Sequence, residues 1–262
     1  MSEERVDKIL LELYPTLTRS KLQKLIDKQK IFYKKNSDWI CLKKASQKFP
    51  TEAKTKWEWR IEKDLETQFV SRGALKLLSA LENFNIDVKG QYCLDIGLST
   101  GGFSDCLLQH GAKKILGIDV GTELLHHSLK DRKELIWLDK INARQPLEES
   151  LLEDFFSQTG RDKFDLIVID VSFISLDKII PNLPAYLHSS GKIIALVKPQ
   201  FELDKKALNK KGVVKDSERL PEVLQKIGRV FAENKLKVIQ ECLSAIEGEN
   251  GNKEFLLLAQ HC

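Results

Sequence analysis

Residues Leu94–Ser104, with the sequence LDIGLSTGGFS, join an apolar strand that ends in an acid to a glycine-rich turn and the start of a helix. Glycine has no side chain, so these glycines let the backbone turn sharply and approach a ligand closely. The free N–H groups at the start of the following helix attract electron-rich groups. The stretch therefore predicts a strand–turn–helix unit of an α/β fold, with a small organic cofactor bound at the turn.

The spacing of the glycines indicates which cofactor this is. A dinucleotide site would have G-x-G-x-x-G, whereas this turn has Gly97, three other residues and then Gly101-Gly102. That form, directly after an acid, is typical of sites for S-adenosylmethionine (SAM), a cationic cofactor that carries an amino acid. An ordinary strand-to-helix turn is the alternative. The candidate cofactor-binding residues of this stretch are Asp95, Gly97, Ser99, Thr100, Gly101, Gly102 and Phe103.

From residue 91 onward, apolar runs alternate with helical patterns. The runs lie near residues 91–96, 114–119, 134–138, 165–170, 192–198, 236–243 and 254–259. Helical segments between the first six predict a parallel sheet covered on both faces. Only residues 246–252 separate the last two runs, too few for a crossover helix, so these two strands should be antiparallel. The expected fold class is α/β: a Rossmann-like SAM methyltransferase domain with a mostly parallel seven-stranded sheet and one antiparallel strand, preceded by a small α+β domain.

Positive charge is concentrated near the N-terminus. Residues 1–63 hold 16 Lys and Arg against 9 Asp and Glu, a net charge of +7, whereas the rest of the 262 residues have a net charge of −3. This asymmetry predicts a small module that meets a polyanion, followed by a larger, near-neutral domain. A solvated lysine-rich face is the alternative. We expect domains at residues 1–62, including a linker, and at residues 63–262.

The basic module has recognisable elements. Apolar residues at helical spacing predict two helices, the second signalled by Ser20, and residues 31–33 and 39–42 flank a polar turn as in a β-hairpin. The arrangement resembles the small RNA-binding domain first described in ribosomal protein S-four. Gln29 and residues 34–36 stand where that domain usually has a Gly and an Asn-Gly turn. The candidate RNA contacts are Arg5, Arg19, Lys21, Lys24, Lys28 and Lys30.

Residues 43–66 are rich in Lys, Glu, Thr and Ser without a clear period, which predicts a linker or an irregular extension. Trp57 and Trp59 lie within it. Tryptophans in such a position either pack between domains, the more frequent use, or stack on unpaired bases.

Cysteine usage and hydropathy bear on the compartment. The five cysteines are scattered and form no C-x-x-C pair, as expected of reduced thiols in a cytosolic protein. The longest apolar runs fall far short of the ~20 residues that a membrane-spanning helix needs. We expect a cytoplasmic protein, a monomer, with no metal and no membrane partner.

Polar residues close the predicted strands at the carboxyl edge of the sheet, where open parallel sheets bind ligands. Asp119 is placed to accept both hydroxyls of the cofactor ribose. Asn142-Ala143-Arg144 follows the third strand, where an adenine edge could bind. The candidate cofactor contacts at this edge are Asp119, Val120, Asn142, Ala143 and Asp170.

Two charged residues, Asp170 and Lys198, close neighbouring strands of aliphatic residues. An unpaired buried charge is costly, so we expect these two to pair. A purely structural ion pair is the alternative to a catalytic one.

Two further residues have little meaning by themselves. Residues 71–81 predict a helix N-capped by Ser71, and Lys76 interrupts its apolar run. Such a lysine is more often exposed than functional. Glu254 opens the last strand as an ordinary strand-end carboxylate would. Arg72 is a further candidate RNA contact.

Taken in order, these motifs resemble the TlyA family of rRNA ribose methyltransferases, known also as hemolysins. The matching stretches are residues 71–77, 94–103, 142–144, 170–176, 197–202, 212–214 and 251–255. The resemblance implies an RNA-binding domain ahead of an FtsJ-like methyltransferase domain, SAM as cofactor, and ribosomal RNA or ribosomal subunits as partner. The reaction it implies is methyl transfer to a ribose 2′-hydroxyl. The family's Lys-Asp-Lys-Glu centre corresponds to Lys76, Asp170, Lys198 and Glu254.

The chemistry explains these residue types. A ribose hydroxyl is a poor nucleophile and must lose its proton as it attacks the methyl group, so a base has to lie within reach. Carboxylates are weak bases, and a neutral amine is a stronger one. We therefore expect Lys198 to be the base and Lys76 to position the 2′-oxygen or a neighbouring phosphate. Asp170 and Glu254 would orient the lysines and the sugar.

Three other functions stay open at the level of sequence. Methylation of an exocyclic amino group of a base usually relies on (D/N)-P-P-(F/Y), and residues 170–173 read DVSF without the prolines. A non-catalytic factor in ribosome assembly would bind no SAM. A membrane-active hemolysin would meet anionic lipid through the basic module.

Overall fold

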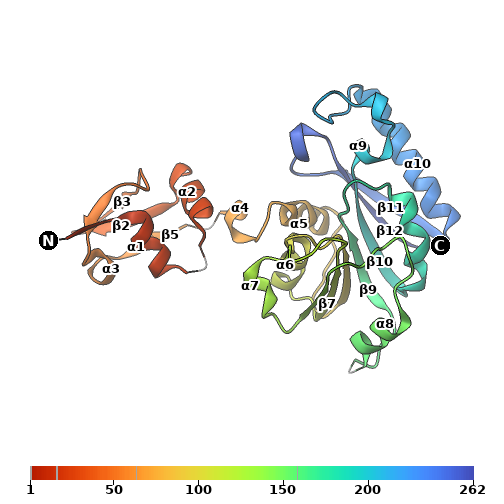
Figure 1. Cartoon of the computed structure of the whole chain (residues 1–262), viewed down its shortest axis with the longest axis horizontal. Coiled ribbons are helices and arrows are strands. Elements are labelled where there is room, and N and C mark those ends of the chain that lie inside the picture. The colour runs from red at the N-terminus through yellow and green to blue at the C-terminus, as the bar shows by residue number, and fades with distance from the viewer. Residues whose placement is uncertain (1, 16, 63, 158) are drawn as a thin grey trace. The chain divides into compact units, whose positions relative to one another are not determined.

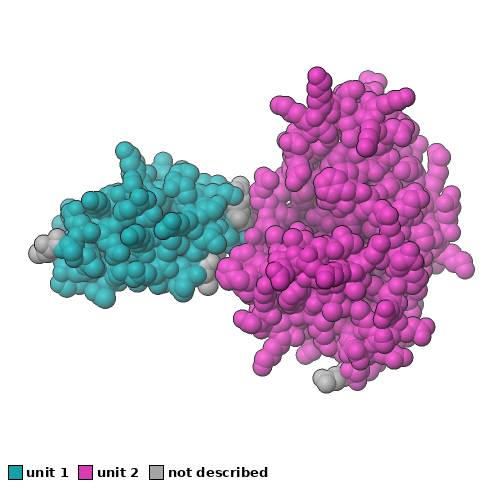
Figure 2. All heavy atoms as spheres, in the orientation of Figure 1, with its two compact units in different colours: residues 1–69 teal, residues 70–262 magenta. Residues whose placement is uncertain are grey.

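The computed structural model describes residues 2–15, 17–62, 64–157 and 159–262, which form two compact units at residues 1–69 and 70–262 (Figures 1 and 2). The division falls after the boundary at 62/63 that charge suggested. The reason is α4 (Leu65–Gln68), which lies against α2 (Arg19–Asp27) and so belongs to the first unit.

The first unit packs its helices against small sheets. Besides α2 it contains α1 (Val6–Leu13), and both turn the apolar faces that the sequence predicted into one core. Thr18, rather than Ser20, caps α2, because its hydroxyl accepts the N–H of Lys21 at 3.2 Å. The expected hairpin is formed by β2 and β3. The strands and the short helix of this unit are β1 (Glu3–Arg5), β2 (Ile31–Lys35), β3 (Asp38–Cys41), β4 (Lys48–Pro50), α3 (Ala53–Lys56) and β5 (Trp59–Ile61).

The prediction of a linker at residues 43–66 is wrong, because β4, α3 and β5 lie there. Strand β5 pairs with β2, and β4 pairs with β1. Trp57 stacks on Tyr33 with ring centroids 5.3 Å apart, and Trp59 meets Phe49 at 5.8 Å. Both tryptophans therefore pack, as the more frequent use predicted, but they pack inside the first unit.

Gln29 shows how this chain departs from the S-four pattern without losing its turn. Its N–H donates to Ile26 O and that of Lys30 donates to Leu25 O, the paired bonds that end a helix in a left-handed residue. Gln29 has a φ of 56°. The position thus has the backbone that favours glycine, which is consistent with the Gly expected there from the resemblance.

The second unit contains the predicted seven-stranded sheet, in the order β11-β12-β10-β9-β6-β7-β8. Strand β12 is antiparallel to both of its neighbours, and the other pairs are parallel. The strand predictions are confirmed, with β10 beginning earlier than expected. The strands are β6 (Tyr92–Ile96), β7 (Lys114–Ile118), β8 (Leu135–Leu138), β9 (Phe164–Ile169), β10 (Leu187–Val197), β11 (Leu236–Leu243) and β12 (Phe255–His261).

Helices flank both faces of this sheet (Figure 1). Fully buried aliphatic residues of the central strands, such as Ile167, Ile193 and Leu257, form its core. The link from β9 to β10 contains two short 3₁₀ helices, Leu176–Lys178 and Ile180–Ala185, instead of an α-helix. The α-helices are α5 (Gly73–Asn83), α6 (Gly102–Gln109), α7 (His127–Lys130), α8 (Glu149–Phe156), α9 (Pro199–Glu202) and α10 (Leu220–Glu233).

Helix α5 begins later than its sequence suggested. Its N-cap residue is Arg72, and no side chain caps it, so the prediction that Ser71 is the N-cap is wrong. Within the part of the chain that the structure describes, no helix is long and apolar enough to cross a membrane.

Candidate active site

The glycine turn connects β6 to α6 as predicted. Gly97 and Gly101 have φ values of 89° and 88°, in the left-handed region that glycine tolerates. A Cβ atom on Gly97 would lie 2.3 Å from Asp170 O, so the turn passes directly over the end of β9. The turn can therefore pack this closely on β9 only because residue 97 has no side chain.

Asp95 lies under this turn rather than in it. The residue is fully buried and its Oδ2 accepts the hydroxyl of Ser104, in the first turn of α6, at 2.6 Å. Asp95 lines neither of the cavities described below. Burial, with the nearby Asp170 and Asp119 charges adding to it, raises the pKa of the Asp95 carboxyl to about 7. The acid that the sequence assigned to the cofactor thus joins the turn to the helix.

We expect the stability of the second unit to fall as pH rises through this range. Between about pH 4 and pH 7 the folded state keeps a proton on Asp95 that the unfolded chain has lost, so the free energy of unfolding decreases with pH. Asp95→Asn should flatten this slope, since the amide oxygen can still accept from Ser104. Urea unfolding at pH 5 and pH 7.5 measures it. The exposed Asp162→Asn is the matched control, and equal slopes in both variants would contradict the prediction.

A cavity of about 420 Å³ opens beside the turn, within the ~300–1,000 Å³ typical of small-molecule sites. Asp119 follows β7 at its edge and fixes the turn, because its carboxylate accepts the N–H groups of Ser99 at 2.7 Å and Gly121 at 2.8 Å. Most of the remaining lining is aliphatic, which suits an adenine ring. The predicted cofactor residues that line this cavity are Gly97, Ser99, Asp119, Val120, Asn142, Ala143 and Asp170.

A second cavity, of about 340 Å³, lies on the other side of the turn. We call this one the acceptor cavity and the first one the cofactor cavity. It shares Gly97, Ser99 and Asp170 with the first cavity. Arg72, a candidate RNA contact, also lines it. Gly101 lines neither cavity. The further predicted residues around the second cavity are Thr100, Gly102, Phe103, Lys76, Lys198 and Glu254.

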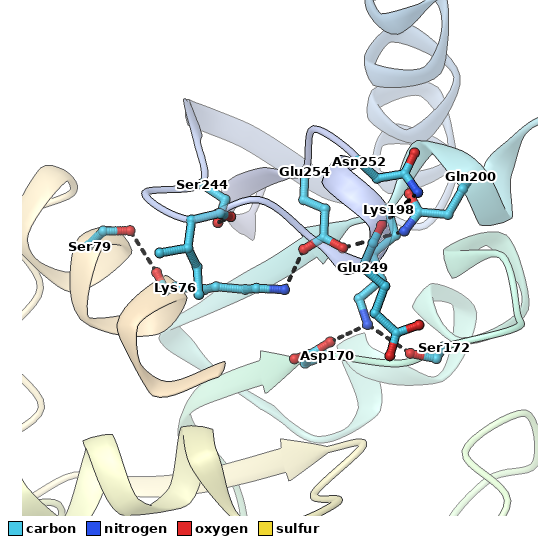
Figure 3. Close-up of polar contacts among 11 residues, drawn as sticks. Lys76, Ser79, Asp170, Ser172, Lys198, Gln200, Ser244, Glu249, Asn252 and Glu254 are labelled. Carbon is cyan, nitrogen blue, oxygen red and sulfur yellow. Dashed lines mark hydrogen bonds and ion pairs between the residues drawn. The ribbon is translucent and has the colours of Figure 1, made fainter. Parts of the chain in front are cut away.

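The four residues predicted for catalysis come together in this second cavity (Figure 3). Lys198 Nζ lies 2.6 Å from Asp170 Oδ1, and Lys76 Nζ lies 2.5 Å from Glu254 Oε2. The side chains of Lys76 and Lys198 are each 11% exposed, and that of Glu254 is 2% exposed. Lys76 is thus not the exposed helix lysine that its helix alone suggested. The site consists of two ion pairs side by side at the rim of the sheet.

Three residues that the sequence analysis did not select complete the site. The hydroxyl of Ser172 accepts from Lys198 Nζ at 2.8 Å, and Gln200 donates to Glu254 Oε1 at 3.4 Å. Phe173 is 84% exposed at the rim of both cavities with a φ of 63°, a strained backbone for an aromatic residue. The exposure of Phe173 had no signal in sequence, because the loop around it reads as apolar.

Glu202 ties two of these segments together. Its buried carboxylate accepts the hydroxyl of Ser175 at 2.5 Å and the N–H of Leu176 at 2.8 Å, and Lys226 donates to it at 3.1 Å. The Ser172–Phe173 loop is therefore fixed to the helix that begins directly after Lys198.

The predicted RNA contacts of the first unit differ in their partners. Arg5, Lys28 and Lys30 make ion pairs with Asp7, Asp64 and Glu62 at 2.8, 3.1 and 3.2 Å. Exposed pairs of this kind contribute little free energy, so they compete weakly with a phosphate. Arg19, Lys21 and Lys24 lie on helix α2.

The residues present fit SAM. The Asp119 carboxylate beside an aliphatic cavity suits an adenosine, and Gly97 and Asp170 line both this cavity and the one that holds the lysines. Among the described residues, no group of three or more His, Cys, Asp or Glu is arranged to hold a metal ion.

Comparison with known proteins defines the class. Residues 69–261 match the family model of the FtsJ-like methyltransferases. The second unit is therefore a SAM-dependent methyltransferase domain, and the chain is an enzyme of that class.

Relatives extend the comparison to the whole chain. It is 34% identical to "Putative rRNA methyltransferase YqxC" of Bacillus subtilis, over 97% of this chain and 85% of that protein. It is 38% identical to "16S/23S rRNA (cytidine-2'-O)-methyltransferase TlyA" of Mycobacterium tuberculosis, over 74% of this chain and 69% of the relative. The chain belongs to the TlyA family. A solved structure described as "Putative hemolysin from Streptococcus thermophilus" covers 100% of this chain and 89% of its own, with 32% identity and a TM-score of 0.69.

Proposed function

We propose that this enzyme transfers the methyl group of SAM to a ribose 2′-hydroxyl of ribosomal RNA. The observation that carries the proposal is the position of Lys198. Its amine lies in a cavity that shares Gly97 and Asp170 with the cofactor cavity, and Asp170 and Ser172 hold it there. Two relatives are named as rRNA (cytidine-2'-O)-methyltransferases, and these names support the same acceptor.

Lys198 acts as the base in this proposal. Asp170 and Ser172 hold Lys198 Nζ at 2.6 and 2.8 Å, so the nitrogen keeps a fixed position at the wall of the cavity that the acceptor would enter. When bound, SAM supplies a methyl group on a positively charged sulfur. Lys198 Nζ would accept the proton that the 2′-oxygen loses when the methyl group leaves the sulfur for that oxygen, and the Asp170 carboxylate would stabilise the resulting ammonium.

Lys76 has the complementary task of holding the acceptor. Its ammonium is fixed by Glu254, and Gln200 fixes Glu254 in turn. A cation held in this way can bind the 2′-oxygen or a neighbouring phosphate oxygen. The exposed ring of Phe173 at the rim offers a surface on which a base can stack.

The alternatives fit the site less well. A base amino group as acceptor leaves the two lysine–carboxylate pairs without a role. An assembly factor without catalysis has no use for a cofactor cavity that adjoins two lysine–carboxylate pairs. The expectation of a monomer stays a prediction, and the proposed rRNA substrate supports a cytoplasmic location.

Mapping of 2′-O-methyl groups tests the proposal. We expect at least one methylated rRNA nucleotide to be lost when the gene is deleted and restored when the wild-type gene is returned. An Asp119→Ala gene, which lacks the carboxylate at the cofactor cavity, should restore much less. If the map is the same with and without the protein, the proposed acceptor is wrong.

A further inference from the structure

Residues 205–215 form an exposed loop between α9 and α10 that carries five lysines and no acid (the lysine loop). Lys205, Lys206, Lys210, Lys211 and Lys215 are all exposed, and none makes an ion pair with a described residue. The rest of this domain is acidic, since residues 64–262 have a net charge of −3 with these lysines included. The lysine loop is therefore a local positive surface on an otherwise negative domain.

The lysine loop has a fixed conformation. Leu208 and Val214 form an antiparallel bridge, and Asn209 N donates to Val213 O at 2.8 Å. The side-chain oxygen of Asn209 accepts the N–H groups of Lys211 and Val213. Because the backbone is held in this way, the loop itself loses less conformational entropy when a ligand binds to it.

Two asparagines attach the lysine loop to the loop before β12, beside which it lies in Figure 1. Asn252, 3% exposed, accepts the N–H of Val214 at 3.2 Å and donates to Gly212 O at 3.0 Å. Asn250 donates to Lys211 O at 3.0 Å. Residues 212–214 belong to the stretches that match the TlyA family but do not contribute to the catalytic site. These bonds give them a structural role.

The lysine loop and the loop before β12 both connect directly to segments of the catalytic centre. Asn252 precedes Glu254 by two residues, and the loop before β12 lines the acceptor cavity through Glu247 and Glu249. At the other end, the lysine loop follows α9, whose Gln200 donates to Glu254. The backbone that carries the lysines is thus connected to the segments that carry Lys198 and Glu254.

We infer that the lysine loop binds the phosphate backbone of the substrate RNA and sets the position of the acceptor nucleotide in the cavity. The inference rests on the proposed function for the identity of the RNA. Five lysines that make no ion pair with a described residue match a polyanion, and the exposed acids Glu247 and Glu249 would repel phosphates on their side of the cavity. RNA backbone is the polyanion that also brings a ribose to Lys198.

The test compares two triple variants with the same change in charge. Lys210→Gln/Lys211→Gln/Lys215→Gln removes three charges from the lysine loop. The control Lys89→Gln/Lys113→Gln/Lys237→Gln removes three exposed lysines near the starts of β6, β7 and β11, at the opposite edge of the sheet. All six side chains are exposed, so both variants should fold, and thermal melting with binding of S-adenosylhomocysteine confirms it.

We expect the loop variant to bind an rRNA fragment about tenfold more weakly at 0.1 M salt and to lose about 2–3 from the slope of log affinity against log salt. KM for RNA should rise while kcat at saturating RNA stays within about twofold. The control variant should match the wild type. Equal RNA affinities and salt slopes in the two variants would overturn the inference, as would loss of affinity for anionic phosphatidylglycerol vesicles but not for RNA.

Failure of the proposed function has a different signature. If the wild type binds rRNA through the lysine loop but transfers no methyl group to it, the RNA contact stands and the acceptor is wrong. If the wild type methylates rRNA and the loop variant binds and methylates it equally well, the proposed function stands and the inference fails.

Discussion

Lys198→Ala is expected to lower the kcat of methyl transfer to rRNA by about 10²–10⁴-fold, the range typical of losing a general base, and to leave SAM affinity within about twofold. The amine lies in the acceptor cavity and is absent from the lining of the cofactor cavity, so cofactor binding should not depend on it. Single-turnover methylation with labelled SAM measures the first effect, and calorimetric titration of SAM measures the second. Near-normal turnover with intact SAM binding would refute the assignment of the base.

A pair of conservative variants separates a base from a structural ion pair. Lys198→Arg keeps a positive charge beside Asp170, but a guanidinium does not lose its proton in proteins, so activity should stay as low as in the alanine variant. Lys76→Arg should keep part of the activity, because Lys76 is proposed to act as a cation opposite Glu254. Recovery of turnover in Lys198→Arg would show that charge, and not proton transfer, is what residue 198 supplies.

The contact between Asp170 and Lys198 could be predicted because topology dictates it. Both residues close aliphatic strands, and parallel strands that are neighbours end at the same edge, so their side chains meet. The sheet itself was predictable for a related reason. Its strands are buried on both faces and therefore form continuous apolar runs that end at polar residues.

The pair formed by Lys76 and Glu254 could not be predicted in this way. The two residues are 178 positions apart, and one lies on a helix that covers the sheet, so no register relates them. Only the family resemblance linked them. The prediction for residues 43–66 failed for another reason. Their strands β4 and β5 and helix α3 are three or four residues long, which is too short to show a period. The packing of Trp57 and Trp59 on Tyr33 orders this segment, and the sequence pattern does not show it.

Gly97→Ala should weaken SAM binding by about 100-fold or more, because the added methyl group would meet backbone rather than a movable side chain. Its ideal position lies 2.3 Å from Asp170 O and 2.8 Å from Asp170 C. The turn and the end of β9 would have to separate, and they line both cavities. We therefore expect the variant to lose acceptor geometry together with cofactor affinity, as measured by titration with S-adenosylhomocysteine and by methylation at saturating SAM.

Gly90→Ala is the matched control for backbone strain. Gly90 has a φ of 74°, also in the left-handed region, but a Cβ atom there would meet nothing within 4 Å. It should cost about 1 kcal/mol of stability, the usual strain of alanine at such a φ, and leave cofactor affinity unchanged. Because both variants carry this strain, the difference between them isolates the close approach of the turn to Asp170. Equal cofactor affinities in the two variants would contradict the prediction. They would show that the close approach of Gly97 to Asp170 does not affect the binding of SAM.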